Sequence, residues 1–382
     1  MSGNTNALNA ELVGAAGSRA ALETPALLLD ADAFEKNVAT LAGLAREAGI
    51  GLRPHAKTHK CAGIAKAQMA AGALGVACAK SGELLALFEA GVTALMLTAP
   101  VASRRKIDRL AQAAARGCDL TVVVDRSELV NDYAEAARAA GATISVLVDC
   151  DTGLGRTGLT KPDDVVALAK TIAAEPSLRY AGVQAYAGHV QHVHAAGERR
   201  KVNAAATARL REIVAALDAA GLAPSIVTGG GTGSHALDFE DRVFTEVQAG
   251  SYIFMDEGYR PVELHGANGP LFDFSMFVAV TVIAHNAQGD AITDGGSKSV
   301  AIDGPPPRAH LAGREIGTIV WVGDEFGKLK LHDGVAVPAI GTRVECTVPH
   351  CDPTANLHDF IHVVRGDRLE AIWPIEGRGK SD

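Results

Sequence analysis

Short apolar segments alternate with longer amphipathic segments from residue 24 to about residue 228. The amphipathic segments repeat apolar residues every three or four positions, which is the spacing of one buried helical face. The short segments are β-like and lie at 26–29, 50–52, 75–79, 94–98, 120–124, 144–148, 181–185 and 225–228. Roughly eight β/α alternations over ~200 residues predict parallel strands covered by helices, and favour a closed (β/α)8 barrel over an open sheet.

The pattern changes near residue 250, beyond which apolar and polar residues alternate one by one. Such runs occur at 277–283, 316–322 and 344–348. A period of two predicts antiparallel β structure. The expected fold class is therefore α/β, with a (β/α)8 barrel over residues 24–258 and a second, mainly antiparallel β domain over residues 259–382. The N-terminal arm, residues 1–23, is expected to pack on this β domain.

Composition narrows the class of protein. The chain has 382 residues, of which 48% are hydrophobic, and a net charge of −8. Its basic residues are dispersed, which argues against nucleic acid or a membrane as a partner. Residues 1–21 lack the features of a signal peptide, and no apolar run approaches ~18 residues. The six cysteines show no CxxC spacing, so we expect reduced thiols in a cytoplasmic protein that acts on a small molecule.

Lys57 is the first candidate for chemistry. It lies in residues 53–60 (RPHAKTHK), after an apolar segment, and Pro54 stops a helix from running through this point. Its neighbours are basic: Arg53, His55, His59 and Lys60. Positive neighbours are expected to lower the pKa of Lys57, and a neutral amine is a nucleophile suited to a Schiff base. A basic surface turn is the alternative interpretation.

A glycine-rich segment follows the apolar segment 225–228. Residues 229–234 (GGGTGS) can point successive N–H groups into one concavity that binds a phosphate. Thr232 and Ser234 could add hydroxyl donors, and residues 250–252 could complete the cradle. The segment is not a Walker nucleotide-binding motif, because no Gly-Lys-Ser/Thr follows it. Residues 231–236 fit a dinucleotide-binding fingerprint loosely, but they lie too late in the chain for the first β/α unit. A glycine-rich turn required only for backbone geometry is the alternative interpretation.

His350 and Asp352 are candidate metal ligands. A continued period of two after residues 344–348 places both on one strand face, with Cα atoms ~6.7 Å apart at about 3.3 Å per residue. Their mixed nitrogen and oxygen donors suit Mn²⁺, Mg²⁺, Co²⁺ or Zn²⁺. Cys351 has the opposite parity and should point away. An exposed histidine and aspartate in a turn is the alternative interpretation.

Two further residues follow the apolar segment 181–185. Tyr186 stands at its end, where an aromatic side chain could simply close the barrel. His192 lies in a histidine-rich loop that could simply be solvated, but neutral imidazole is the usual general base near neutral pH. His192 is therefore a candidate acid–base residue.

Four segments in the same order resemble the D-threonine aldolases. They are residues 53–60 (RPHAKTHK), 228–234 (TGGGTGS), 245–252 (TEVQAGSY) and 349–359 (PHCDPTANLHD). The similarity runs from about residue 24 to residue 378. These enzymes use pyridoxal 5'-phosphate and have the alanine-racemase type of fold, fold type III. The resemblance also implies a homodimer.

The resemblance implies a role for each candidate residue. Lys57 is similar to the Schiff-base lysine, Arg156 to the partner of the cofactor ring, and His350 with Asp352 to the metal pair. The implied phosphate contacts are Thr232, Gly233, Ser251 and Tyr252. Three more residues complete the implied site. Tyr186 lies on the cofactor and substrate side, His192 is the acid–base residue, and Asp324 is a substrate-side candidate. Ala187 and Ala79 depart from the polar residues expected there, so the resemblance does not fix the substrate preference.

The implied activity is that of a carbon–carbon lyase that needs pyridoxal phosphate and a divalent metal, with Mn²⁺ first among the ions. It would cleave D-3-hydroxy amino acids such as D-threonine to glycine and an aldehyde. The alternatives are a 3-hydroxy-D-aspartate aldolase, which releases glyoxylate, and a D-serine or 3-hydroxyaspartate dehydratase. Such dehydratases often carry a His-x-Cys pair, so Asp352 favours the aldolase. A racemase usually needs a tyrosine from the β domain, and none occurs after Tyr259; a cofactor carrier without turnover would not need the metal pair.

Overall fold

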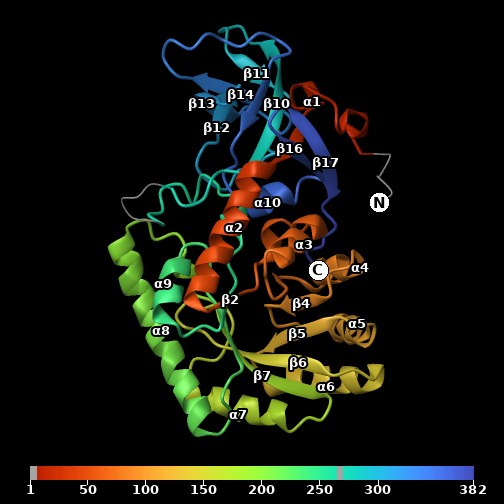
Figure 1. Ribbon diagram of the computed structural model, residues 1–382, viewed down its shortest axis with the longest axis vertical. Helices are drawn as coiled ribbons and strands as arrows, with labels where there is room; N and C mark the ends of the chain where they lie inside the picture. The colour runs from red at the N-terminus through yellow and green to blue at the C-terminus, as the bar shows by residue number, and fades with distance from the viewer. Residues whose placement is uncertain (1–6, 265–269) are drawn as a thin grey trace.

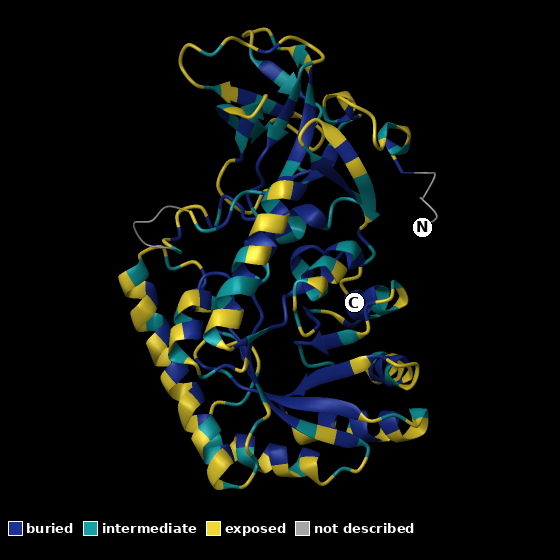
Figure 2. Ribbon diagram, in the orientation of Figure 1, coloured by how far each residue is buried: buried dark blue, intermediate teal, exposed yellow. Residues whose placement is uncertain are grey.

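The computed structural model describes residues 7–264 and 270–382. It has two parts, a barrel of parallel strands and a β domain of mostly antiparallel strands, which lies above the barrel in Figure 1. Most residues of the barrel strands are buried, whereas buried residues alternate with intermediate and exposed ones along several strands of the β domain, as Figure 2 shows. One hydrophobic core runs from the barrel into the β domain. The predicted fold class is confirmed.

Among the described residues, eight parallel strands form the barrel, in the order β2-β9-β8-β7-β6-β5-β4-β3. They are β2 (Gly51–Leu52), β3 (Val76–Cys78), β4 (Ala94–Leu97), β5 (Asp119–Val124), β6 (Ile144–Asp149), β7 (Leu178–Ala185), β8 (Ile226–Gly229) and β9 (Glu246–Val247). The barrel closes just after β2, where the Ala77 N–H donates to the Pro54 carbonyl at 2.9 Å. This closure holds the chain that follows β2 at the carboxyl end of the barrel.

Helices cover the outside of the barrel. They are α2 (Ala31–Ala48), α3 (Ala62–Ala70), α4 (Ser81–Glu89), α5 (Arg104–Ala115), α6 (Ser127–Ala140), α7 (Pro162–Ala173), α8 (Ala196–Ala219) and α9 (His235–Asp241). Asp30 caps α2 by accepting the Ala33 N–H at 3.2 Å, and Gly49 ends it with a φ of 70°. Shorter helices lie in the connections: η1 (Ala10–Leu12), α1 (Ser18–Ala21), η2 (Ala56–Thr58), η3 (Gly188–Val190), η4 (Ser251–Ile253) and α10 (Cys351–Ala355).

The β domain is built on a nine-stranded sheet within the described residues, in the order β11-β14-β13-β12-β15-β10-β1-β16-β17. The strands are β1 (Ala26–Asp30), β10 (Met276–His285), β11 (Ala291–Thr293), β12 (Arg308–Leu311), β13 (Arg314–Trp321), β14 (Gly327–Leu331), β15 (Arg343–Cys346), β16 (Phe360–Arg365) and β17 (Arg368–Pro374). β1 pairs antiparallel with β10 and parallel with β16.

The assignment of residues 26–29 to the barrel is therefore wrong. These residues form β1, which is buried on both faces: Leu27 and Leu29 contact the main core, and Leu28 contacts a second cluster in the β domain. A strand buried on both faces reads as a continuous apolar run, just as a barrel strand does. β9 fills the barrel position instead, and its two residues are too few to show a pattern.

The described part of the N-terminal arm packs on the β domain. Arg19 makes an ion pair with Glu345 of β15 at 2.8 Å, and the Gly14 N–H donates to the Leu369 carbonyl of β17 at 2.8 Å. Residues 1–6 of the arm lie outside the described residues. The arm thus contacts β15 and β17, which lie on opposite sides of β1 in the sheet.

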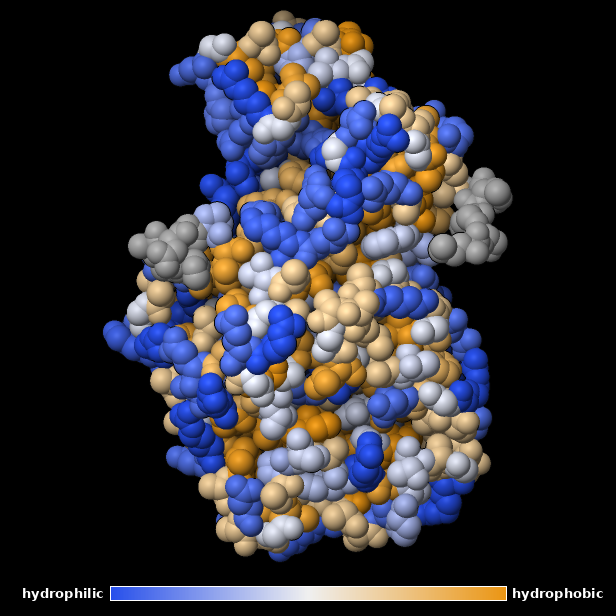
Figure 3. Space-filling model, in the orientation of Figure 1, coloured by the Kyte–Doolittle hydropathy of each residue, from blue (hydrophilic) through white to orange (hydrophobic). Residues whose placement is uncertain are grey.

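In the described ranges, no helix is both long and apolar enough to cross a bilayer. Figure 3 shows hydrophilic residues interspersed with hydrophobic ones over the visible face. This distribution agrees with the dispersed charge of the sequence.

Glu83 of α4 makes stability depend on pH. Burial raises the pKa of Glu83 to about 7. Between pH ~4 and ~7 the folded protein therefore holds a proton that the unfolded chain has lost, so stability falls as the pH rises through this window. We expect Glu83→Gln to reduce this fall by roughly 1–3 kcal/mol in urea unfolding at pH 5 and pH 8. The exposed Glu89 of the same helix provides the control, Glu89→Gln, and an unchanged pH dependence in Glu83→Gln would contradict the prediction.

Candidate active site

Lys57 lies where the barrel meets the β domain. It is the middle residue of η2, which follows β2, so its position at the carboxyl end of an early strand agrees with the sequence prediction. Its ammonium group forms an ion pair with Asp352 of α10. The Lys57 side chain is 40% exposed and that of Asp352 is 15% exposed. A strand end of the barrel and the candidate metal segment of the β domain thus form one site.

The predicted lowering of the Lys57 pKa is wrong. Burial lowers this pKa, but the charge and hydrogen bond of Asp352 outweigh burial and raise it above the ordinary value. Three of the four basic neighbours, His55, His59 and Arg53, add little positive charge. Burial lowers the pKa of His55 to about 3 and that of His59 to about 4, so both rings are neutral. Arg53 is neutralised by a carboxylate of β9 at 2.8 Å.

Unsatisfied donors gather beside Lys57. The Thr58 hydroxyl is buried and has no hydrogen-bond partner in the described part of the chain. It lies against the backbone of Gly250, where an added Cβ would come within 2.6 Å of it. The Thr232 hydroxyl accepts the Tyr252 N–H at 3.0 Å, so its own proton is free to be donated. A cradle of free donors closed to larger residues fits a phosphate group.

Other parts of the glycine turn, which we define as residues 229–234, are already bonded within the protein. The Gly233 N–H donates to the Gln191 side chain at 2.8 Å. Ser234 donates its proton to Asp238 at 2.6 Å, so the expectation that Ser234 offers a hydroxyl donor to a phosphate is wrong. The Tyr252 phenol is buried and hydrogen-bonded to Gln68 at 3.1 Å, which leaves this residue close to the turn through its backbone. Sequence analysis missed Gln191 and Asp238, because an isolated glutamine or aspartate carries no pattern.

Arg156 and Tyr186 face each other at the end of β6 and β7. The Arg156 guanidinium lies 5.4 Å from the centre of the Tyr186 ring. The loop that carries Arg156 is folded around Asp151, whose carboxylate accepts the Gly153 and Leu154 N–H groups at 2.8 Å each. Burial raises the pKa of Tyr186, and the charges of Lys57 and Arg156 act in the opposite direction.

His192 reaches the same region from the loop after η3. His192 is exposed, and its ring contacts that of Tyr259, with the ring centres 4.4 Å apart and the ring planes tilted by 39°. Asp256, three residues before Tyr259, accepts the Tyr259 N–H at 2.9 Å and the Cys351 N–H at 3.0 Å. One short segment therefore links His192 to the helix that carries Asp352. Asp256 is another residue that the sequence pattern did not indicate.

His350 and Asp352 converge, but not on a strand as predicted. β15 ends at Cys346, and His350 is the residue before α10. A helix start suits this segment because Pro353 is tolerated in a first turn. The His350 Nε2 and Asp352 Oδ2 atoms lie 3.7 Å apart. The Cys351 sulfur lies 3.0 Å from a buried carboxylate oxygen of the 256–259 segment and 3.9 Å from the Asp352 Oδ2 atom, so it does not point clear of the pair as predicted.

The donor set fits a divalent ion bound through two protein ligands. His350 Nδ1 is 2.8 Å from the Asp303 carboxylate, which fixes the ring proton there and leaves the Nε2 lone pair facing Asp352. In residues 7–264 and 270–382, no three His, Cys, Asp or Glu side chains converge as a complete ligand set. Water or substrate oxygen atoms would complete the coordination of an ion at this pair.

Asp324 is not brought to the other candidate residues. It lies exposed between β13 and β14, where the Ser297 hydroxyl donates to it at 3.0 Å and its carbonyl accepts the Lys298 N–H at 3.0 Å. Neither partner belongs to the site. Its predicted role on the substrate side gains no support from these contacts.

Known proteins resemble this chain over nearly its whole length. Residues 29–258 match the family described as alanine racemase, N-terminal domain, and residues 275–364 match the putative serine dehydratase domain. A 3-hydroxy-D-aspartate aldolase of Paracoccus denitrificans (strain Pd 1222) is 36% identical, over 94% of this chain and 93% of the relative. A D-threonine aldolase of an Arthrobacter species is 38% identical, over 95% and 94%.

A solved structure gives the same result. The crystal structure of D-threonine aldolase from Filomicrobium marinum superposes with a TM-score of 0.90 at 40% identity, covering 95% of this chain and 98% of that one. The shared alanine-racemase type of fold implies pyridoxal phosphate as the cofactor, and the free donors around Thr58 and Thr232 fit its phosphate group. The chain therefore belongs to the D-threonine aldolase family.

Proposed function

We propose that the protein is an aldolase that cleaves D-3-hydroxy amino acids, such as D-threonine, to glycine and an aldehyde. The contact between Lys57 and Asp352 carries this proposal. It places the amine that would hold pyridoxal phosphate beside a ligand that would hold a divalent metal. A substrate bound beside Lys57 would therefore lie next to the metal segment.

Each group has a separate task. Bound pyridoxal phosphate supplies an electron sink for the negative charge that develops at Cα. Lys57 anchors the cofactor, and Thr58, Thr232 and Ser251 bind its phosphate. The Gly233 and Tyr252 N–H groups already donate within the protein, so these two residues only border the phosphate. Arg156 and Tyr186 orient the ring. His350 and Asp352 hold the metal, which would supply Lewis acidity at the β-hydroxyl. His192 takes the hydroxyl proton as the general base.

The residue two positions after His350 favours an aldolase over a dehydratase. Dehydratases of this fold are expected to carry a His-x-Cys ligand pair, whereas this chain has Asp352 at the second ligand position. The match to the putative serine dehydratase domain keeps dehydration as the second candidate. 3-Hydroxy-D-aspartate is an alternative aldolase substrate because a relative bears that name.

A product assay separates these activities. The enzyme, loaded with pyridoxal phosphate and Mn²⁺, is incubated with D-threonine, D-serine and the 3-hydroxyaspartate isomers. Glycine with an aldehyde or glyoxylate supports the aldolase, and ammonia with a keto acid means dehydratase. We further propose Mn²⁺ as the metal, with Mg²⁺, Co²⁺ and Zn²⁺ to be compared, and a cytoplasmic homodimer without nucleic-acid or membrane partners.

His192→Ala is expected to lower kcat by about 10²–10⁴-fold, because a positioned general base contributes about that much. The cofactor band should remain, since His192 is not its anchor. The pH dependence of kcat/KM should also lose the limb that belongs to the base. His194→Ala, in the same exposed loop, serves as the control. Equal rates in the two variants would remove His192 from the mechanism.

Asp303→Ala is expected to weaken Mn²⁺ binding by about 10–100-fold, because a carboxylate that orients a ligating histidine contributes about that much. Asp303→Asn should lose less, since its oxygen can still accept the His350 proton. Titration of the protein with Mn²⁺ by calorimetry measures the effect. Asp333→Ala, an exposed aspartate elsewhere in the β domain, should bind Mn²⁺ normally, and normal binding by Asp303→Ala would contradict the assignment.

A further inference from the structure

Gln191 is a buried polar residue that the proposed reaction does not use. It is 2% exposed and directly precedes His192. Its side-chain oxygen accepts the Gly233 N–H at 2.8 Å, and its NH₂ group donates to the Ser234 hydroxyl at 3.0 Å and the Ala187 carbonyl at 3.3 Å. The amide therefore joins the loop of His192 to the glycine turn.

The glycines of the turn leave the space that Gln191 occupies, because they have no side chain. A Cβ on Gly233 would lie 2.0 Å from the Gln191 carbonyl oxygen, and one on Gly231 would lie 2.5 Å from the Gln191 Oε1 atom. Larger residues would push the loop away from the turn. Glycine at these two positions thus permits docking of the His192 loop, in addition to any approach of a phosphate.

The orientation of the Gln191 amide follows from its neighbours. The Gly233 N–H can only donate, so the Gln191 oxygen must face it and the NH₂ group must face Ser234. Ser234 donates its own proton to the buried Asp238 at 2.6 Å. The Ser234 oxygen must then accept, and it does so from the Gly231 N–H at 3.1 Å and from the Gln191 NH₂ group. The network has one consistent direction and every member is buried.

We propose that Gln191 is a positioning residue that couples the phosphate end of the cofactor site to His192. The inference rests on the proposed function for the roles of the glycine turn and of His192. A phosphate bound by the Thr232 hydroxyl restrains the next two residues of the turn, Gly233 and Ser234. The Gln191 amide, which contacts both, transmits that restraint to His192. The contact of the His192 ring with Tyr259 restrains the ring from the opposite side.

Hydrogen exchange of the unmodified protein tests this coupling. The protein is saturated either with pyridoxal phosphate or with pyridoxal, which forms the same bond to lysine but lacks the phosphate. We expect only pyridoxal phosphate to slow exchange in residues 187–193, and by at least about tenfold, since roughly one additional hydrogen bond's worth of restraint is transmitted. Equal protection by both compounds would overturn the proposal.

Gln191→Met provides the second test, because methionine keeps the volume but makes none of these hydrogen bonds. In this variant pyridoxal phosphate should still form its visible band, should bind about tenfold more weakly, and should no longer protect residues 187–193. His189→Ala, an exposed residue of η3, is the control and should behave as the wild type. Retained protection in Gln191→Met overturns the proposal. If the variant does not fold, the comparison of the two cofactors in the wild type still decides.

Neither measurement requires turnover. If none of the substrates is cleaved but the two cofactors protect the loop differently, the proposed function fails and the coupling stands. If cleavage occurs and the protection is equal, the coupling fails and the proposed function stands.

Discussion

Lys57→Ala is expected to abolish the visible absorption of the protein incubated with pyridoxal phosphate, and to lower aldolase activity by more than about 10³-fold. Alanine offers no amine at the end of β2, so the cofactor has no covalent anchor. The substitution also leaves Asp352 without its ion-pair partner. Absorbance titration and glycine production from D-threonine measure the two effects.

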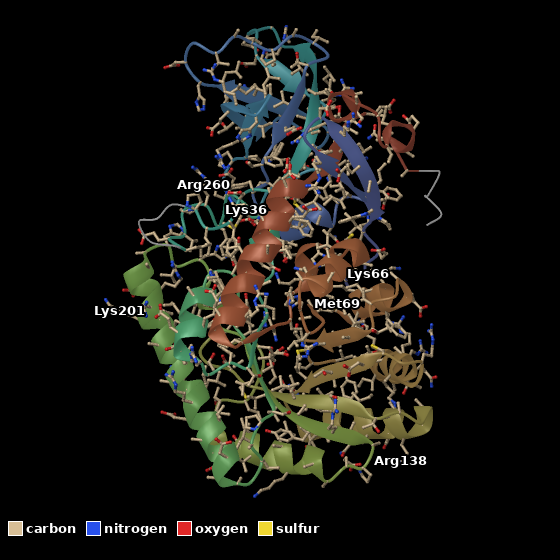
Figure 4. The ribbon with its side chains drawn as sticks, viewed as in Figure 1. Lys36, Lys66, Met69, Arg138, Lys201 and Arg260 are labelled. Atoms are coloured by element: carbon tan, nitrogen blue, oxygen red, sulfur yellow. The ribbon has the colours of Figure 1, made fainter. Side chains whose placement is uncertain are left out.

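The matched control is Lys66→Ala. Lys66 lies on α3, is labelled in Figure 4, and donates to the Ala90 carbonyl at 2.7 Å on the exposed surface. It should keep both the band and the activity. A normal band in Lys57→Ala would mean that another amine holds the cofactor, and the whole assignment of the site would fall with it.

His350→Ala is expected to lose carbon–carbon cleavage while keeping the cofactor band. A metal acting as a Lewis acid contributes several kcal/mol, which corresponds to about a thousandfold or more in rate. Chelation of the wild type should give the same loss, and added Mn²⁺ should restore the wild type but not the variant. His332→Ala, an exposed histidine of the same domain that pairs with Glu315 at 3.1 Å, is the control. Cleavage that survives both chelation and the substitution would exclude a role for the metal.

Most of the fold could be predicted from the sequence, because strands buried on both faces and amphipathic helices leave distinct periods. The sequence pattern was not sufficient for β1, which was predicted as a barrel strand, or for β9, which takes its place in the barrel. β1 has the pattern of a barrel strand but pairs with β10 and β16, and β9 has two residues and no pattern. Pairing partners depend on the tertiary structure, which the local pattern does not record.

The site was predicted in the same uneven way. Strand ends located Lys57, and the spacing of His350 and Asp352 brought them together although their segment is a helix start. The sign of the Lys57 pKa shift was wrong because its controlling partner, Asp352, is 295 residues away in the sequence. Gln191 was missed because its importance lies entirely in what it contacts.

The central position of β1 affects how the protein can be made and divided. β1 is synthesised before the barrel, but its partner β10 is not synthesised until about 250 residues later. Strand pairings that distant in sequence form slowly. A fragment of residues 259–382 would lack the strand between β10 and β16 and would expose two unpaired edges, which promote aggregation. The β domain therefore cannot be studied by simple truncation; joining residues 7–30 to residue 270 onwards through a flexible linker is the minimal alternative.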